Sequence, residues 1–115
     1  MKYHLLNSAV ITKEGIYTAE RISLPEFLTL VDTAYEKGKL YNYIGYETNI
    51  KLLNSMLDIR LSINRDEIIN LEDGDILLVM KLKRRLQNVS FKSDAKFQSN
   101  ISINDFEFFK IVYHR

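Results

Sequence analysis

The stretch "ILLVM" (Ile76–Met80) decides the fold, because every one of its residues is apolar. A strand with one wet face alternates apolar and polar residues, whereas an unbroken apolar run indicates a strand covered on both faces. We therefore expect a central strand here. Asp73-Gly74, just before it, is a strong turn signal and predicts a hairpin between "RDEIIN" (65–70) and "DILLVMKL" (75–82).

Further strands are predicted on both sides of this centre. Short segments that carry β-branched and aromatic residues and are bounded by turn residues are typical of strands. We expect them at residues 2–6, 16–22, 40–44 and 106–114. The polar segment "SFKSDAKFQSN" (90–100) has no such pattern and predicts a long mobile loop.

Two amphipathic helices are expected between these strands. "SLPE" (23–26) fits a capping box, with Pro25 in the first turn, where its missing N–H costs nothing. Apolar residues then recur at helical spacing over 27–35, so a helix should end near Gly38. A second helix is predicted over 47–58. The order of elements indicates a single α/β domain, a mixed sheet of about five strands flanked by helices.

The composition excludes several classes of protein. The chain of 115 residues (1–115) is long enough for one domain. Sixteen basic and fifteen acidic side chains give a net charge of +1, which argues against a duplex-DNA binder. The absence of cysteine excludes disulfides and zinc–thiolate sites. With no apolar run of about 18 residues and no signal-peptide pattern, we expect a cytoplasmic protein with no membrane contact.

The turn after the predicted strand 40–44 is the most suggestive candidate site. If a helix begins at Glu47, the free N–H groups of its first turn point at whatever lies above Gly45, and the helix dipole adds positive charge. Thr48 and Asn49 would donate further hydrogen bonds, and Tyr46 would stack on a ring. The alternative is that Gly45 only makes the turn and that Thr48 or Asn49 caps the helix.

Other polar groups are weaker candidates. The basic run "KLKRRL" (81–86) would leave the end of a buried strand and could hold phosphates, although solvated charge runs are commoner. Asn64-Arg65 is a further amide and cationic point. His4 and His114 belong to no recognisable triad, and no motif indicates a metal or a cofactor.

Four segments together resemble the viral ring nucleases, small anti-CRISPR proteins that bind and cleave cyclic tetra-adenylate. They are "YNYIGYETNIKLLNSML" (41–57), "LSINRDEI" (61–68), "LEDGDILLVMKLKRRL" (71–86) and the closing "FEFFKIV" (106–112). The resemblance implies a homodimer that holds the cyclic nucleotide across its two-fold axis. It also implies metal-free cleavage, in which a ribose 2′-hydroxyl attacks the phosphate with the help of a histidine.

Transferred residue by residue, the resemblance preserves part of the family's site. The Ile-Gly-His pattern before the second helix reads Ile44-Gly45-Tyr46, so a tyrosine stands at the position of the histidine acid. The Asn-Arg pair is present as Asn64 and Arg65.

Other positions of the family's site lie in the first loop and after the basic run. The arginine at the scissile phosphate corresponds to Arg85, whereas the acidic residue just beyond it is replaced by Asn88. In the loop after the first strand, Asn7 and Ser8 would supply small polar groups to the ligand, with Val10 where the family can have serine.

These replacements favour binding over cleavage. A phenol with a pKa of about 10 is a poor proton donor near neutrality compared with an imidazole at about 6.5. We therefore expect a counter-defence protein of viral or mobile-element origin that sequesters a cyclic oligonucleotide. The alternatives are an active metal-independent ring nuclease, a small dimeric nucleic-acid-binding regulator, or an interaction module that pairs through a free sheet edge or its aromatic end, 106–113.

Overall fold

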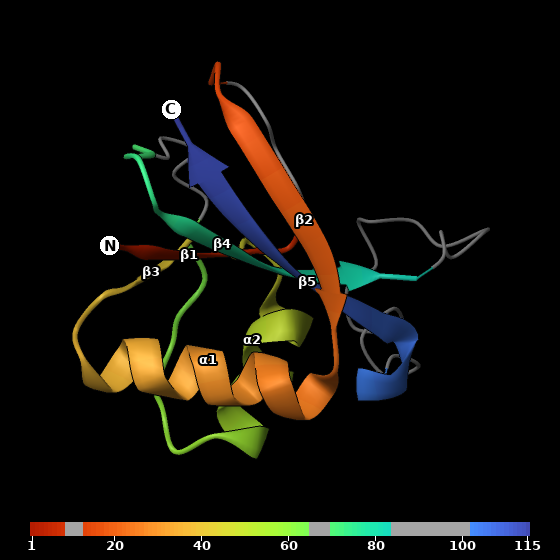
Figure 1. Cartoon of the computed structure of the whole chain (residues 1–115). Helices are drawn as coiled ribbons and strands as arrows, with labels where there is room; N and C mark the ends of the chain where they lie inside the picture. Colours follow the sequence, from red (N-terminus) through yellow and green to blue (C-terminus); the bar gives the residue numbers. More distant parts are fainter. Residues whose placement is uncertain (9–12, 65–69, 84–101) are drawn as a thin grey trace.

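In the part of the chain that the structure describes, one five-stranded mixed sheet packs with two helices, as predicted (Figure 1). The computed structural model describes residues 1–8, 13–64, 70–83 and 102–115. The strands are β1 (Tyr3–Leu6), β2 (Ile16–Ile22), β3 (Leu40–Asn42), β4 (Ile76–Leu82) and β5 (Phe106–His114); the helices are α1 (Leu24–Glu36) and α2 (Glu47–Met56), and a 3-10 turn (Ile103–Asp105) precedes β5.

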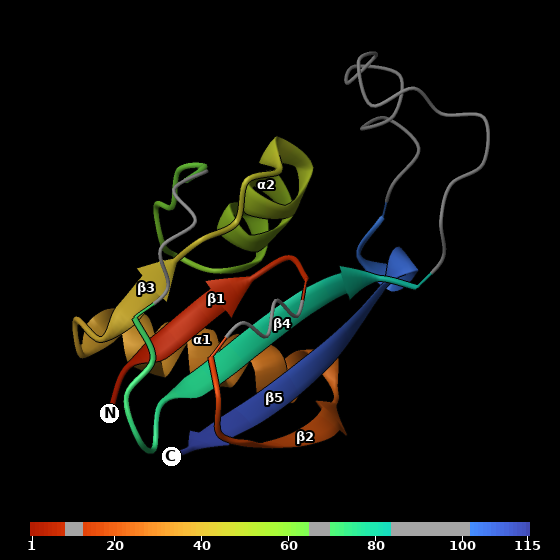
Figure 2. The same ribbon diagram turned by 90° about the horizontal axis from the view of Figure 1, so that it is seen from above.

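The strand order is β2-β5-β4-β1-β3 (Figure 2). Strands β3, β1 and β4 are parallel, with Leu5 of β1 opposite Leu78 of β4. Strand β5 runs antiparallel between β4 and β2. The predicted loop at 90–100 lies outside the described residues.

The predicted hairpin before β4 is wrong. The Asp73-Gly74 turn does form, and Gly74 adopts a positive φ of 86°. However, residues Ile76–Val79 have β1 on one side and β5 on the other, so no neighbouring position is left for a strand at 65–70. The turn therefore leads the chain into the middle of the sheet. Residues 65–69 themselves lie outside the described ranges.

Strand β4 is the buried centre that its apolar run predicts. Leu78 and Met80 are fully buried on the face that the helices cover, where they belong to the larger core. Leu77 and Val79 point to the opposite face and pack with Tyr113 in a second cluster. Burying both faces of one strand gives the domain two apolar layers, and the sheet separates them.

Helix α1 follows its sequence signals closely. The hydroxyl of Ser23 accepts a hydrogen bond from the N–H of Glu26 at 3.3 Å, and Pro25 occupies the first turn. Phe27 lies on the buried face and packs against Phe108 of β5, with ring centroids 4.7 Å apart. Helix α1 thereby closes the sheet on one face (Figure 1).

Two predicted elements end early, and the aromatic end of the chain lies inside the sheet. Strand β3 stops at Asn42 because its side-chain Oδ1 accepts the N–H of Ile44 at 3.0 Å and turns the chain away from the sheet. Helix α2 stops at Met56, before the predicted 58. The aromatic end 106–113 lies in β5, between β4 and β2, so it offers no free edge. In the described ranges, no helix is long and apolar enough to cross a membrane.

Candidate functional site

The candidate site lies where the parallel strands end. Strands β3, β1 and β4 point in one direction, and helix α2 begins just beyond the end of β3 (Figure 2). Ligands of α/β sheets commonly bind outside the carboxyl ends of parallel strands, because loops and helix N-termini converge there. The predicted site residues around Gly45 all lie at these carboxyl ends of the parallel strands.

The N-terminus of α2 is open. Tyr46 occupies the N-cap position, and its side chain makes no capping hydrogen bond. The first intrahelical bond runs from the N–H of Ile50 to the carbonyl of Tyr46 at 3.3 Å. Among the described residues, no acceptor is recorded for the backbone N–H groups of Glu47, Thr48 and Asn49. Three such groups, together with the helix dipole, favour an anion at this end.

The side chains of this first turn differ in what they can offer. Thr48 and Asn49 are buried, 8% and 5% exposed, so their side chains pack against the protein. Tyr46 is 52% exposed and presents its ring beside the open N–H groups. Glu47 pairs with Lys51 at 3.3 Å on the exposed side of the helix. The turn therefore offers backbone donors and one aromatic ring.

Asn7 connects the end of β1 to this turn. Its side-chain Oδ1 accepts the N–H of Gly45 at 3.5 Å, a long hydrogen bond. Just before it, the N–H of Tyr43 donates to the carbonyl of Leu5 at 2.8 Å, which completes the pairing of Leu5 with Asn42 at the end of β3. Ser8 follows and is exposed. The structure thus brings the predicted ligand residues Asn7 and Gly45 into contact.

Asn64 has a structural role at the back of the same turn. Its Nδ2 donates to the carbonyl of Asn42 at 2.9 Å, and its backbone N–H donates to the carbonyl of Ile44 at 2.8 Å. Asn42 in turn donates from Nδ2 to the carbonyl of Ser62 at 2.6 Å. These bonds hold the segment 61–64 against β3 and fix the path of the chain into Gly45.

A third asparagine, which no sequence motif marks, completes this scaffold. Asn54 of α2 accepts the N–H of Leu61 at 3.0 Å and donates to its carbonyl at 2.9 Å. The only signal in the sequence is the recurrence of asparagine around the turn, at 42, 49, 54 and 64. Asparagine suits this task because one amide both donates and accepts.

Three predicted ligand residues, Arg65, Arg85 and Asn88, lie outside the described residues. Strand β4 ends at Leu82, and since β4 is parallel to β1, that end faces the same edge of the sheet as Asn7. The exposed Lys83 is the last described residue before the basic pair.

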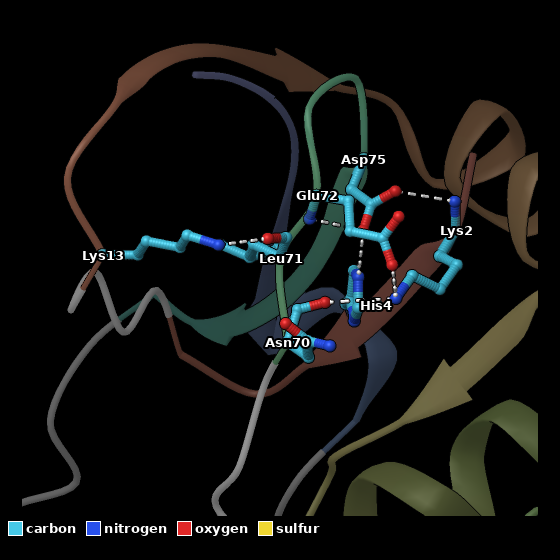
Figure 3. A network of polar contacts seen from close by, with 7 residues as sticks. All are labelled: Lys2, His4, Lys13, Asn70, Leu71, Glu72 and Asp75. Atoms are coloured by element: carbon cyan, nitrogen blue, oxygen red, sulfur yellow. Dashed lines mark hydrogen bonds and ion pairs between the residues drawn. The ribbon is translucent and has the colours of Figure 1, made fainter.

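The opposite end of β1 carries a closed polar network (Figure 3). Asp75, 1% exposed, accepts the backbone N–H of Lys2 at 2.9 Å and that of Glu72 at 3.0 Å. Its Oδ2 also lies 3.0 Å from Nε2 of His4, which is equally buried. At the surface, Nζ of Lys2 reaches the carboxylate of Glu72 at 2.8 Å. The network fastens β1 to the start of β4.

The charges of this network are set by its contacts. Burial alone raises the pKa of Asp75, but the hydrogen bonds from His4 and from two backbone N–H groups outweigh it, so that pKa lies below the usual range. The hydrogen bond between Lys2 and Glu72 raises the pKa of the lysine and lowers that of the glutamate. Asp75 is therefore an ionised, fully bonded hub at neutral pH.

His4 completes the hub without forming a reactive site. Its ring lies between Tyr41 and Tyr43, with centroids 5.9 and 5.8 Å away. Its Nδ1 has no hydrogen-bond partner among the described residues. Since His4 is only 1% exposed, no substrate reaches it, and its contribution is to pack and to donate to Asp75. The sequence signal for this pair is a histidine inside one apolar strand and an aspartate directly before another.

Comparisons with known proteins identify relatives of the chain. A sequence profile of the STIV B116-like family matches residues 3–108. Uncharacterized protein 26 of Sulfolobus islandicus filamentous virus (isolate Iceland/Hveragerdi) is 28% identical over 114 residues, which are 96% of this chain and 92% of that protein. Uncharacterized protein YddF of Bacillus subtilis (strain 168) is 34% identical over 65 residues, 56% of this chain and 58% of YddF.

Among solved structures, B116 of Sulfolobus turreted icosahedral virus has a similar fold, with a TM-score of 0.72 at 23% sequence identity. The match covers 96% of this chain and 98% of that one. The relatives thus include proteins of two viruses and one bacterium, and the architecture of B116 is shared from end to end.

Proposed function

The chain belongs to the STIV B116-like family, and from this premise we propose that it binds a cyclic oligonucleotide second messenger at the carboxyl ends of β1 and β3. Cyclic tetra-adenylate or a related ring is the expected ligand. The observation that carries the proposal is the open N-terminus of α2, which has no side-chain cap and begins beside the loop at Asn7. A phosphate placed there would satisfy the free N–H groups.

The described residues around this point suit a nucleotide. A phosphate would accept from the N–H groups of residues 47–49, and the half-exposed ring of Tyr46 would stack on a base. Asn7 uses its Oδ1 for Gly45, so its Nδ2 remains available to donate to the ligand, and the hydroxyl of Ser8 lies next to it along the chain. The asparagines behind the turn supply the rigidity that a preorganised site needs.

The proposed outcome of binding is sequestration with weak or no cleavage. Attack by a ribose 2′-hydroxyl needs an acid to protonate the leaving oxygen, and loss of such an acid costs about 10²–10⁴-fold in rate. In this chain the position is occupied by Tyr46, and a phenol is in general a much weaker acid than an imidazolium. Binding needs no such proton. A ring held but not cut would blunt an immune signal on behalf of a virus or mobile element.

The remaining parts of the proposal rest on the resemblance to ring nucleases. Arg65 and Arg85 would neutralise phosphates, and Asn88 would occupy the position at which the ring nucleases have an acidic residue. A homodimer would place two copies of the turn around one ring. Strand β4, which precedes the basic run in the sequence, is parallel to β1, so its carboxyl end lies on the side of the sheet that holds Asn7.

Calorimetric titration with cyclic tetra-adenylate and other cyclic di- and trinucleotides, followed by chromatography of the mixture, tests this function. Binding of one ring per two chains, with the ring recovered intact, is the expected result. Recovery of linear products would show that the protein cleaves the ring instead of sequestering it. No binding to any ring, together with salt-sensitive binding to many nucleic-acid sequences, would overturn the proposal in favour of a nucleic-acid regulator.

A further inference from the structure

The two borders of the sheet are built differently (Figure 2). Strand β3 spans only three residues, and the segment 61–64 is bonded to its outer side through Asn42 and Asn64. Strand β2 spans seven residues and pairs with β5 in an unbroken register from Ile16 to Ile22. Its other side has no strand among the described residues. One border is covered, and at the other no described strand pairs with the outer backbone groups of β2.

Among the described residues, β2 lacks most of the devices that protect a free edge, although it carries the charged Glu20 and Arg21. Proline, a β-bulge, a very short strand or a covering helix would prevent pairing with another chain. Strand β2 contains no proline, its register has no bulge, and Ile22 alone of its residues belongs to the core cluster that α1 helps to form. Residues 18–21 are exposed, and Ile16 is 65% exposed. Such an edge can accept another strand.

We propose that β2 pairs antiparallel with β2 of a second copy of this chain, around a two-fold axis at Ala19. In a two-fold pair the residues opposite each other have numbers that sum to twice the central number, and they lie on the same face of the sheet. Centred on Ala19, Thr18 lies opposite Glu20, and its hydroxyl can donate to the carboxylate. On the other face, Arg21, whose guanidinium already pairs with Glu107 of β5 at 3.0 Å, lies opposite the aromatic ring of Tyr17.

The two neighbouring registers are less complementary. Centring the pair on Glu20 would place two glutamates directly opposite each other. Centring it on Thr18 would put the apolar Ile16 opposite Glu20 and leave Arg21 opposite Gly15. In the Ala19 register, Ile16 instead meets Ile22 of the second copy and loses its exposure to water. The strand is therefore complementary to itself in one register.

This association is independent of the proposed nucleotide site. Strand β2 lies at one border of the sheet, and β3, which leads into Gly45, lies at the other. Each chain can thus use the β2 edge whether or not a ring is bound. If the nucleotide site also joins two chains, the two contacts together give an assembly larger than a dimer.

Two substitutions at one exposed position test the pairing. Thr18→Glu places a glutamate opposite Glu20 of the second copy twice per pair, whereas Thr18→Lys places an ion pair there twice. Sedimentation velocity of the full-length chain over a range of concentrations measures the association. We expect Thr18→Lys to pair through β2 at least as tightly as the unmodified chain, and Thr18→Glu to lose this pairing. The dissociation constants of the two variants should differ by about tenfold or more.

Circular dichroism provides the folding control, since Thr18 is exposed and both variants should keep the wild-type spectrum. The proposal is overturned if the unmodified chain is monomeric throughout. It is equally overturned if Thr18→Lys and Thr18→Glu show the same association, whether both variants keep the β2 pairing or both lose it. Titration of both variants with cyclic tetra-adenylate separates the two proposals, because loss of the β2 step should leave nucleotide affinity unchanged.

Discussion

The two ends of β1 are built for opposite purposes. At the amino end, the carboxylate of Asp75 accepts hydrogen bonds from His4 and from two backbone N–H groups, and almost nothing of it reaches water. At the carboxyl end, Asn7 meets Gly45 through one long hydrogen bond, and the first turn of α2 has no cap. One end is satisfied within the protein, and the other leaves donors for a ligand.

This difference separates stability from recognition. A buried charge that is fully hydrogen-bonded holds two strands together, and its removal leaves polar groups unsatisfied. Open N–H groups at a helix start contribute little to folding but favour an anion. Substitutions at the amino end should therefore change the free energy of unfolding, whereas those at the carboxyl end should change ligand affinity or turnover.

The largest expected effect tests the open end through its chemistry. Tyr46→His restores an imidazole at the position of the general acid, and we expect cleavage of cyclic tetra-adenylate to rise by about 10²–10⁴-fold. Chromatography of the products over time measures this rate. Tyr46→Phe is the matched control, since it keeps the ring and should bind without cutting. An intact ring with the histidine variant would show that the tyrosine is not what limits cleavage.

The second-largest effect is expected from a substitution in the polar network at the amino end of β1. Asp75→Asn removes the charge from the hub and leaves fewer acceptors for three N–H donors, so we expect a loss of about 3 kcal/mol in the free energy of unfolding. Urea denaturation measures it, and nucleotide affinity of the folded fraction should not change. Glu72→Gln is the control, because it touches only the exposed pair with Lys2 and should cost little. If Asp75→Asn were as stable as the wild type, the polar network around Asp75 would not be what stabilises this end of β1.

A smaller effect is expected from the exposed ring alone. Tyr46→Ala should weaken binding by about 1–3 kcal/mol, the contribution of one base stacked on an aromatic side chain. Stability should hardly change, because the ring is half exposed. Tyr35→Ala on α1, 39% exposed, is the matched control and should leave calorimetric affinity unaltered. Equal losses from both substitutions would argue against a specific platform at Tyr46.

The smallest effect is the pH dependence of the closed end. Because the pKa of Asp75 is lowered by folding, its contribution to stability is complete above the ordinary aspartate pKa of about 4 and is lost as pH falls through the lower, folded value. The stability gap between the wild type and Asp75→Asn should therefore narrow below about pH 4. Urea midpoints at several pH values measure this gap. A gap that is constant down to acid pH would contradict the assignment.

Local signals predicted much of this fold, and long-range pairing limited the rest. Helix α1 and strand β2 matched their predicted starts because a cap and an alternating pattern are written in adjacent residues. The hairpin at Gly74 failed because the position beside β4 is taken by β1, more than 70 residues earlier in the chain. Nothing near Asp73 in the sequence reports that competition.

The candidate site also combines features that local sequence predicts with features that depend on long-range contacts. The strand-turn-helix around Gly45 and the open N-terminus of α2 followed from local pattern. The bond from Gly45 to Asn7 and the support from Asn64 depend on chain folding, so spacing alone could not predict them. Sequence alone does not mark Asp75, because a polar residue after a turn is ordinary and only its burial makes it a hub.

Backbone amide chemical shifts during titration with cyclic tetra-adenylate test the central claim most directly. If a phosphate binds at the open end of β1, the largest shifts should appear at Gly45 and at residues 46–49, with Asn7 also affected. The amides of Lys2 and Glu72, which donate to Asp75, should move little. Shifts concentrated around Asp75, or none at all at saturating ligand, would contradict the account.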